Sequence, residues 1–405
     1  KTALISVSNK EKLILILKTL KKFKINLISS GGTYKQIKKL GFDCLEVSKF
    51  TESEEILDGR VKTLHPKIHA GILSKRSNKL HNLQLKKRGF EEIDLVIVNF
   101  YPFENILLKN KNHKEIIENI DVGGPAMVRA AAKNYSDVTI ITNPDKYSEF
   151  LNEIISNKGC TTLKFRKNMA EEAFSETAYY DSLIKNYFNH LNGSKFPEKK
   201  IIYGNLIEKL RYGENPHQEG AIYSTKKKIN IKKISGKNLS FNNYNDIFSA
   251  IRISKSLPKN IGTVIVKHSN PCGVSINKNK INSYKEAHAC DPISSFGGIV
   301  SCNFKIDEKV AIELNKIFFE IIIGVGFNKD ALKILKNKKN LRIIDASNVK
   351  FENLNNITTN FNSILIQNHD NRIFKKKDFK IVSEKKPNNK EFNNLIFAFN
   401  VCRNV

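Results

Sequence analysis

The chain has 405 residues, of which 40% are hydrophobic and 27% charged, so it is long enough for two or more domains with a packed core. Its formal net charge of +28 invites comparison with nucleic-acid-binding proteins. The lysines, however, are spread along the chain in short clusters, and no recognised nucleic-acid-binding module is present. We therefore expect the positive field to attract small anionic substrates rather than a polynucleotide.

The cysteines show neither a CxxC pair nor the close spacing of a zinc site, so we expect free thiols in a reducing cytosol and no metal. They are Cys44, Cys160, Cys272, Cys290, Cys302 and Cys402. No apolar run approaches the length of a membrane span, and the opening KTALISVS lacks the basic start and long apolar core of a signal peptide. These patterns predict a soluble, cytoplasmic protein.

The chain begins with alternating strand and helix patterns. Residues Ala3–Val7 are typical of a buried strand, and Ser8 and Asn9 are suitable capping residues for the helical pattern that begins at Leu13. A second strand, Ile25–Ile28, runs into the sequence SSGGT, which opens another short helix. This β-α-β-α order predicts a mostly parallel sheet with helices on both faces.

Further buried strands are expected at Asp94–Asn99 and Val138–Thr142, and helical patterns then extend to about Leu191. The hydrophilic stretch Asn192–Lys200 is a candidate boundary between domains. We therefore predict a first domain of residues 1–195 and a second of residues 196–405.

Two stretches of the first domain have the composition of an anion-binding site. In SGGT, glycines between a strand and a helix would let backbone N–H groups approach a phosphate, although such a pair is often only a turn. The stretch DGRVKTLHPKIHAG contains Arg60, Lys62, His65, Lys67 and His69, which suits an anion site or, alternatively, a solvated basic loop. A second glycine pair, in DVGGP, precedes a helical pattern that carries two more basic residues.

In the second domain, the strand pattern Thr263–Val266 ends in Lys267 and His268, followed by a Ser-Asn-Pro-Cys-Gly turn. Ligands of open α/β sheets lie beyond the carboxyl ends of strands, so a cation and an imidazole at this place suggest catalysis. The alternative is an ordinary solvated pair before a turn.

Several motifs together resemble one family. RYGENPHQ, KHSNPCGV and CDPISSFGGIV follow one another in the second domain, and ALISVSNK, SSGGT, DGRVKTLHP, NFYPF, IDVGGP and AAAKN do so in the first. In order and spacing they resemble the bifunctional purine biosynthesis proteins, which combine phosphoribosylaminoimidazolecarboxamide (AICAR) formyltransferase with inosinate (IMP) cyclohydrolase. The departures are small: Asn9 stands where the family usually has Asp, and Ser295 where Ala is common.

The resemblance implies an α/β fold for both domains. The first would be a doubly wound, methylglyoxal-synthase-like cyclohydrolase domain, and the second an α/β formyltransferase domain with a cytidine-deaminase-like core. The family continues beyond the position matched by Val405, so the second domain is expected to be incomplete. Two enzymatic functions therefore remain open: a bifunctional enzyme, or a cyclohydrolase whose second domain is inactive or structural. A basic nucleic-acid-binding protein remains a remote alternative.

The resemblance also assigns roles to individual residues. Ring closure falls to Lys62, Tyr101, Asp121 and Lys133. Nucleotide binding, mainly of the phosphate, falls to Ser6, Ser8, Lys10, Ser30, Gly32, Thr33, Arg60 and Thr63. In the formyltransferase half, the catalytic residues are Lys267 and His268, and the AICAR site contains Arg211, Tyr212, Asn243 and Asp291.

The chemistry implied by the resemblance needs no metal and no tightly bound cofactor. The formyl donor is 10-formyltetrahydrofolate, which acts as a co-substrate, and the nucleotides are AICAR, its formylated product FAICAR, and IMP. His268 is suited to accept a proton from the attacking amine, because an imidazole titrates near neutral pH. The family is homodimeric, so we expect a homodimer that binds neither nucleic acid nor membrane.

Overall fold

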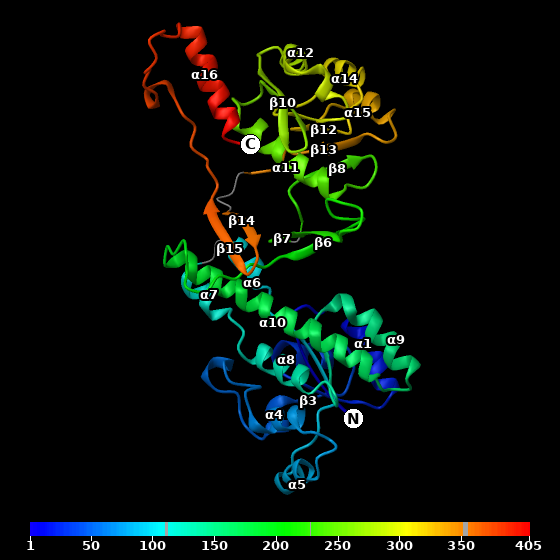
Figure 1. Cartoon of the computed structure of the whole chain (residues 1–405). Helices are drawn as coiled ribbons and strands as arrows, with labels where there is room; N and C mark the ends of the chain where they lie inside the picture. The colour runs from blue at the N-terminus through cyan, green and yellow to red at the C-terminus, as the bar shows by residue number, and fades with distance from the viewer. Residues whose placement is uncertain (110–111, 227, 351–354) are drawn as a thin grey trace. The chain divides into compact units, whose positions relative to one another are not determined.

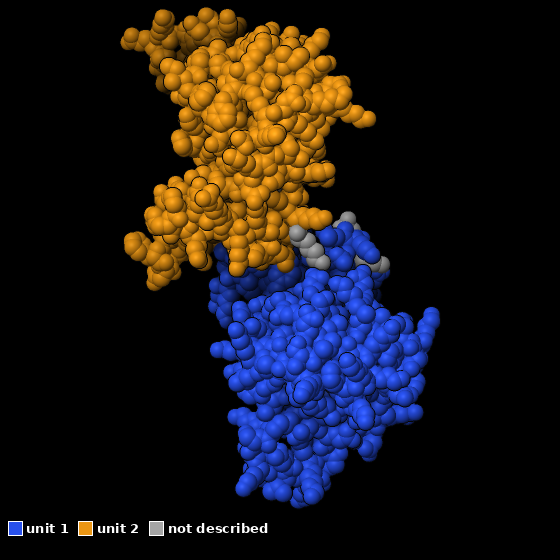
Figure 2. Space-filling view, turned by 90° about the vertical axis from the view of Figure 1, so that its right-hand side faces the viewer, with its two compact units in different colours: residues 1–203 blue, residues 204–405 orange. Residues whose placement is uncertain are grey.

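The computed structural model describes residues 1–109, 112–226, 228–350 and 355–405. The chain divides into two compact units, residues 1–203 and 204–405 (Figure 2). The ring of Tyr203 packs edge-on against Tyr179 of the first unit, with centroids 5.5 Å apart. The stretch after the last long helix of the first unit therefore packs with that unit.

Unit 1 is built on a five-stranded sheet in the order β3-β2-β1-β4-β5, in which every pairing is parallel (Figure 1). Its strands are β1 (Thr2–Val7), β2 (Asn26–Ser29), β3 (Leu45–Glu46), β4 (Leu95–Asn99) and β5 (Thr139–Ile141). β1 and β4 are buried apolar runs, as expected for parallel strands covered on both faces. The predicted parallel sheet is confirmed.

Helices cover both faces of this sheet. The helices of this unit are α1 (Leu13–Lys22), α2 (Gly31–Lys39), α3 (Val47–Thr51), α4 (Pro66–Leu73), α5 (Lys79–Arg88), α6 (Phe103–Leu108), α7 (His113–Glu118), α8 (Gly123–Lys133), α9 (Tyr147–Ser156) and α10 (Leu163–Leu191). α1 packs against α9, whereas α8 packs against α4 and α10, and both groups bury side chains in one core cluster with the strands. This is the doubly wound arrangement that the sequence predicts.

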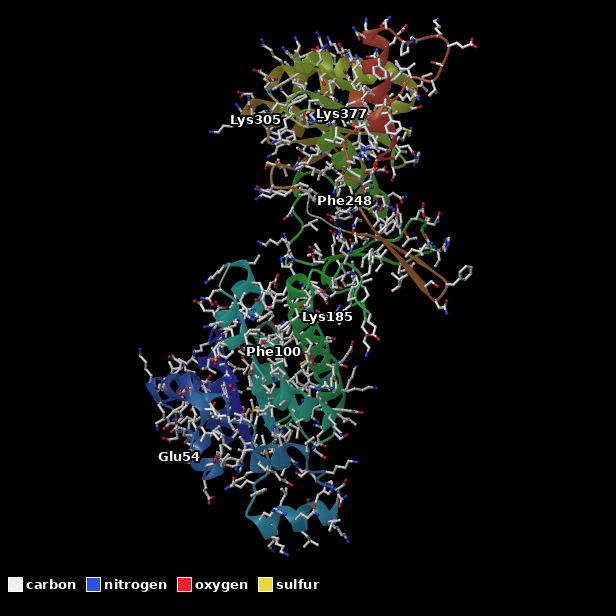
Figure 3. All side chains as sticks on the ribbon, turned by 90° about the vertical axis from the view of Figure 1, so that its left-hand side faces the viewer. Glu54, Phe100, Lys185, Phe248, Lys305 and Lys377 are labelled. Atoms are coloured by element: carbon white, nitrogen blue, oxygen red, sulfur yellow. The ribbon has the colours of Figure 1, made fainter. Side chains whose placement is uncertain are left out.

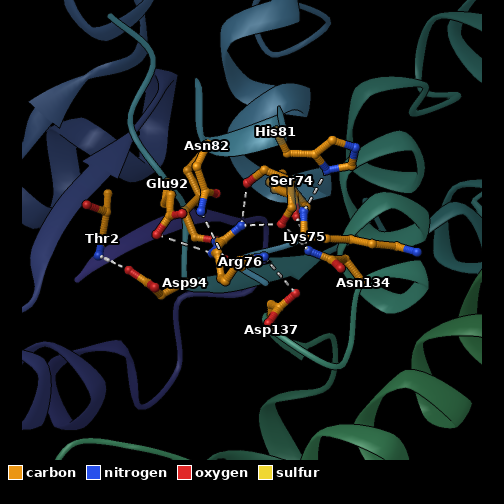
Figure 4. Close-up of polar contacts among 12 residues, drawn as sticks. Thr2, Ser74, Lys75, Arg76, His81, Asn82, Glu92, Asp94, Asn134 and Asp137 are labelled. Carbon is orange, nitrogen blue, oxygen red and sulfur yellow. Dashed lines mark hydrogen bonds and ion pairs between the residues drawn. The ribbon is translucent and has the colours of Figure 1, made fainter. Parts of the chain in front are cut away.

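A polar network anchors the carboxyl end of α8 (Figure 4). Asn134, which follows the helix and is buried, donates from Nδ2 to the carbonyls of Ile72 at 2.8 Å and Ser74 at 2.9 Å. The Arg76 guanidinium donates to the Ile93 carbonyl at 2.9 Å and forms an ion pair with Glu92. These contacts fix α8 against the segment that follows α4.

Unit 2 contains a six-stranded mixed sheet in the order β10-β9-β11-β12-β13-β8. The strands are β8 (Lys232–Ser235), β9 (Gly262–Lys267), β10 (Asn270–Ile276), β11 (Ile299–Cys302), β12 (Ile321–Gly324) and β13 (Arg342–Asp345). β11, β12 and β13 are mutually parallel, whereas β9 is antiparallel to both of its neighbours. β8 is antiparallel to β13 at the other edge, so the unit is an α/β domain whose three central parallel strands are flanked on both sides by antiparallel pairings.

Two helical layers bury this sheet. Its helices are α11 (Phe241–Ser256), α12 (Lys280–Cys290), α13 (Pro292–Ser295), α14 (Glu308–Asn315) and α15 (Lys329–Lys336). Ile322 of β12 belongs to the cluster that contains residues of α12, α14 and α15, whereas Ile321 and Ile323 belong to the cluster that contains α11. Because side chains alternate along a strand, these clusters lie on opposite faces.

The direction of β9 corrects one sequence-based argument. Val266 pairs with Ile299, the first residue of β11, so β9 ends at the edge where β11 and its parallel neighbours begin. The rule that ligands lie beyond the carboxyl ends of strands applies to parallel strands. It therefore gives no support for a ligand site at Lys267 and His268. They lie at the amino-end edge of β11, β12 and β13.

The described part of unit 2 also contains two hairpins, a 3-10 helix, η3 (Lys376–Asp378), and a longer helix. The hairpins are β6–β7 (Asn205–Leu210 and Gly220–Ser224) and β14–β15 (Asn355–Asn360 and Ser363–Asn368), and the longer helix is α16 (Asn389–Cys402). Within the described ranges of the chain, no helix is both long and apolar enough to cross a membrane.

The network at the end of α8 generates a stability prediction. Asn134→Ala should lower the free energy of unfolding by about 2 kcal/mol, because two carbonyls of the α4–α5 connection lose a buried donor. Urea-induced unfolding measures the change. The control is Asn82→Ala, which removes an exposed hydrogen bond to the Arg76 carbonyl and should change stability by less than about 0.5 kcal/mol. Equal effects would contradict the anchoring role.

Candidate functional sites

The first site lies at the carboxyl ends of β1 and β4. The strand order reverses between these two strands, which makes their ends the switch point where ligands bind in open parallel sheets. Asn99, the last residue of β4, accepts hydrogen bonds at Oδ1 from Ser8 N at 2.7 Å and Ser8 Oγ at 3.0 Å. Ser6, half-buried in β1, pairs in register with Val98. Asn99 thus fixes the loop that carries Ser8 and Lys10.

The amino terminus of α2 opens at the same edge. Its N-cap Ser30 makes no side-chain capping bond, so the first N–H groups of the helix remain available to an anion. Thr33 is buried and its hydroxyl both accepts from Val7 N and donates to the Val7 carbonyl, at 3.0 Å each. This side chain ties the helix terminus to the end of β1.

Two lysine ammonium groups lie beside this helix terminus. A β-carbon on Gly32 would lie 3.7 Å from Lys10 Nζ, and one on Gly31 would lie 3.6 Å from Lys62 Nζ. Gly31 has a φ of +52°, a conformation that glycine adopts without steric cost. Backbone N–H groups, the positive end of a helix dipole and two cations therefore converge, which is an arrangement suited to a phosphate.

Three cations of the basic stretch around the start of α4 already form ion pairs with carboxylates of the chain. Arg60 pairs with Glu118, Lys62 with Glu55, and Lys67 with Glu52. His65 is the N-cap of α4 and accepts from Lys67 N, and His69 is half-buried, so burial lowers its pKa. An anionic substrate would have to displace carboxylates from Arg60 and Lys62.

Asp121 lies immediately before α8 and acts as a capping residue. Its Oδ1 accepts from Gly124 N at 2.9 Å, and a β-carbon on Gly124 would collide with the carboxylate. Burial raises the pKa of Asp121, and the Gly124 hydrogen bond opposes this only in part. Thr63 Oγ1 lies 2.7 Å from the place of a β-carbon on Gly123, so Thr63 reaches the same helix terminus. A carboxyl group with a raised pKa suits proton transfer.

The two other residues assigned to ring closure differ from Asp121 in position. Tyr101 follows the end of β4 by two residues and is 56% exposed. Lys133 is the last residue of α8, about 16 Å along the helix from its start. It lines a cavity of 970 Å³ together with Arg129, Lys167 and Phe174. The structure therefore does not bring Lys133 to the Asp121 end of α8.

Two residues of this site were missed by sequence reasoning. Asn99 ends a buried strand, but its importance follows only from the pairing of β4 with β1. The Tyr180 hydroxyl on α10 accepts from Asp121 N at 2.8 Å, although the two residues are 59 positions apart. The Tyr180 ring also packs 5.0 Å from that of Phe100, whose place is marked in Figure 3. No local sequence motif predicts a contact between residues so far apart in the chain.

The second site surrounds the β9–β10 turn of unit 2. Lys267 ends β9, and Nζ donates to the Phe296 carbonyl at 3.1 Å. His268 is exposed and occupies the first position of the two-residue turn before β10. His268 and Ser269 have φ values of 52° and 63°, a conformation that costs about 1–2 kcal/mol for each residue with a β-carbon.

Asp291 lies close to this pair. It is the N-cap of the short helix α13, which packs against β9 and β10, and its Oδ1 accepts from Ser294 N at 2.9 Å. Hydrogen bonds from Ser294 hold the pKa of Asp291 below its usual range, and the Lys267 cation lowers it further. A lysine, an imidazole and an ionised carboxylate thus share one edge of the sheet.

The remaining predicted residues lie before α11 and at its start. The Arg211 guanidinium lies over the Tyr212 ring, 5.8 Å from its centroid. The Asn242 side chain donates to the Glu214 carbonyl, which joins this loop to the start of α11. Asn243, predicted to contact substrate, is buried, and its amide accepts from Ser240 N and donates to Glu320. These contacts fix the Asn243 side chain at the start of α11, and its contact with substrate stays a prediction.

The described part of the chain contains no group of three or more His, Cys, Asp or Glu side chains placed to hold a metal ion. Together, the two units form a two-domain α/β protein with an anion site at a parallel-sheet switch point and a lysine–histidine site in a mixed sheet. This geometry is typical of an enzyme that binds phosphorylated small molecules.

Comparison with known proteins identifies the family. The model of the AICARFT/IMPCHase bienzyme family matches residues 131–405, and that of the MGS-like domain matches residues 12–126. The whole chain is 41% identical to the bifunctional purine biosynthesis protein PurH of Bradyrhizobium diazoefficiens and 44% identical to those of Thermoanaerobacter sp. and Clostridium kluyveri. It spans 78%, 80% and 80% of their lengths. The chain belongs to this bienzyme family.

The raised pKa of Asp121 generates a pH prediction. Above that pKa the folded protein buries a carboxylate, whereas Asp121→Asn keeps an acceptor for Gly124 N without the charge. The variant should therefore have the higher free energy of unfolding at pH 8. Its advantage should shrink toward pH 5, because the folded wild type takes up the proton more readily than the unfolded chain. Urea-induced unfolding at both pH values tests this, and an advantage that grows on acidification would contradict it.

Proposed function

We propose that the chain catalyses the last two steps of IMP synthesis: formyl transfer from 10-formyltetrahydrofolate to AICAR in unit 2, and closure of FAICAR to IMP in unit 1. Family membership over the whole chain supports this assignment. The structural observation that carries it is the convergence of Lys10 and Lys62 on the uncapped amino terminus of α2. That arrangement suits the phosphate which both nucleotides carry.

Ring closure needs the carboxamide nitrogen of FAICAR to attack the formyl carbon of the same molecule, after which water leaves. With the phosphate bound at α2, residues at the carboxyl ends of β1 and β4 can hold the carboxamide and formyl groups of FAICAR close together, in a near-attack geometry. Lys62 is proposed from the family pattern to stabilise the developing oxyanion, and Asp121, whose pKa is raised by burial, is suited to accept or return a proton. Tyr101 and Lys133 are proposed for the same step from the family pattern, although Lys133 lies at the far end of α8 from Asp121.

In unit 2, the AICAR amine attacks the formyl carbon of the folate and forms a new C–N bond. His268 accepts the amine proton, and Lys267 stabilises the tetrahedral oxyanion. The bond from the formyl carbon to the folate nitrogen then breaks, and that nitrogen takes a proton as tetrahydrofolate leaves. Arg211, Tyr212, Asn243 and Asp291 are proposed to bind AICAR, and the folate acts as a co-substrate rather than a resident cofactor.

We further propose that the protein acts as a cytoplasmic homodimer that binds neither nucleic acid nor membrane, as its family resemblance implies. Sedimentation at micromolar concentration tests the dimer directly, and a monomer would contradict it.

The phosphate site generates a kinetic prediction. Lys10→Met should raise the KM for FAICAR roughly 10- to 100-fold, because a charge-assisted contact of about 1.5–3 kcal/mol is lost. The kcat of ring closure and the rate of formyl transfer should change little. Lys18→Met, which removes an exposed cation on α1, is the matched control and should leave the KM unchanged. An unaltered KM in Lys10→Met would contradict phosphate binding at α2.

The assignment of one reaction to each unit generates a second kinetic prediction. His268→Ala should reduce formyl transfer by roughly 100-fold or more, because the general base is lost, while closure of pre-formed FAICAR proceeds at the wild-type rate. Steady-state assays of both half-reactions on the same preparation measure the two effects. Equal loss of both activities would contradict the two-site assignment. A wild-type chain that closes FAICAR but transfers no formyl group would favour the alternative of a structural second unit.

A further inference from the structure

The backbone at His268 is unusual for its residue types. Lys267 pairs with Asn270 across the β9–β10 hairpin, so His268 and Ser269 are the two loop residues and both have positive φ. Two-residue hairpin loops of this kind strongly favour Asn-Gly or Gly-Gly, which tolerate a left-handed backbone. Two residues with β-carbons persist there only if neighbouring structure holds them.

The neighbouring structure is one face of α11. Asp246 Oδ1 accepts from Ser269 N at 2.7 Å and from Ser269 Oγ at 3.2 Å. Ser249, three residues further along the helix, donates from Oγ to the Ser269 carbonyl at 2.6 Å. Residues three apart lie on the same face of a helix, so one helix holds both the donor and the acceptor of the Ser269 backbone.

The helix that makes these contacts is itself fixed. α11 begins with a capping box between Ser240 and Asn243, and the Asn243 amide donates to Glu320 at 3.0 Å. Ile247 and Ala250 are fully buried beneath the helix, next to positions 246 and 249 in the chain. Phe248, which is labelled in Figure 3, is 42% exposed. α11 can therefore act as a rigid support for the turn.

We propose that Asp246, assisted by Ser249, is a positioning residue for formyl transfer: by holding Ser269 it selects the left-handed turn that presents His268 beside Lys267. This inference rests on the proposed role of His268 as the base. No described contact joins Asp246 to the imidazole, so Asp246 acts through Ser269 and not on the reacting proton. Without the contacts of Asp246 and Ser249 to Ser269, the turn adopts other backbone conformations and the His268 imidazole moves away from Lys267.

The test compares three variants of the full chain. Asp246→Ala should lower the kcat of formyl transfer roughly 10- to 100-fold, the usual cost of a misplaced catalytic group, with the KM for AICAR within about twofold. Asp246→Asn should recover most of the rate, because the amide oxygen still accepts from Ser269 N. Asn245→Ala removes an exposed neighbour on α11 and should leave the rate unchanged. FAICAR closure should stay at the wild-type rate in all three.

A double-mutant cycle separates turn selection from general damage. Glycine adopts positive φ without the steric cost, so Asp246→Ala should cost less kcat in a Ser269→Gly background than in the wild-type chain. Hydrogen exchange supplies a readout independent of turnover: loss of its acceptor should speed exchange of the Ser269 amide roughly 10-fold or more in Asp246→Ala.

Each outcome discriminates. An unchanged kcat and unchanged exchange in Asp246→Ala would overturn the inference, as would an Asp246→Asn variant as impaired as Asp246→Ala. An equal loss in both backgrounds would also overturn it. If His268→Ala leaves formyl transfer intact, the proposed function of unit 2 fails. If His268→Ala abolishes transfer while Asp246→Ala is harmless, only the positioning role fails.

Discussion

Both candidate sites depend on one constraint: a backbone that leaves a sheet must find new hydrogen-bond partners. A strand end loses its ladder, and buried N–H and C=O groups left unpaired cost about 1–3 kcal/mol each. In unit 1, Thr33 supplies both a donor and an acceptor to Val7, and Asn99 accepts from the Ser8 backbone. In unit 2, Asp246 and Ser249 do the same for Ser269. The side chains that pair with these backbone groups therefore also fix the positions of the neighbouring site residues.

Electrostatics then determines how each site is used. The net charge of +28 makes the whole molecule attractive to anions, yet Arg60 and Lys62 are already paired with Glu118 and Glu55. These pairs are largely exposed, so their net stabilisation is small and substrate phosphate can compete for the cations. Asp121 shows the opposite balance, since burial disfavours its charge. A pair of weakly held cations and a partly desolvated carboxyl group suit anion binding and proton transfer, respectively.

Local patterns predicted the parts of the fold that depend on local physics. The buried strands β1 and β4, the helix that opens at SGGT and the long helix ending at Leu191 all follow from apolar periodicity and glycine position. The prediction failed where partners are remote. Ser8 and Asn9 do not cap α1, whose N-cap is Lys12; both donate to Asn99, about ninety positions away. Likewise, no sequence pattern shows that β9 is antiparallel to its neighbours.

The same distinction between local and remote contacts separates the two candidate sites. The site of unit 1 follows from topology, because a parallel sheet with a switch point offers a crevice wherever β1 and β4 end. The topology of unit 2 does not predict its site in this way, since the β9–β10 turn joins two antiparallel strands and does not lie at a switch point between parallel strands. There the imidazole is presented by a left-handed turn that costs about 1–2 kcal/mol per residue, and α11 offsets that cost through the Ser269 contacts. Precision at His268 therefore comes from a helix that precedes it in sequence and contributes no reacting group.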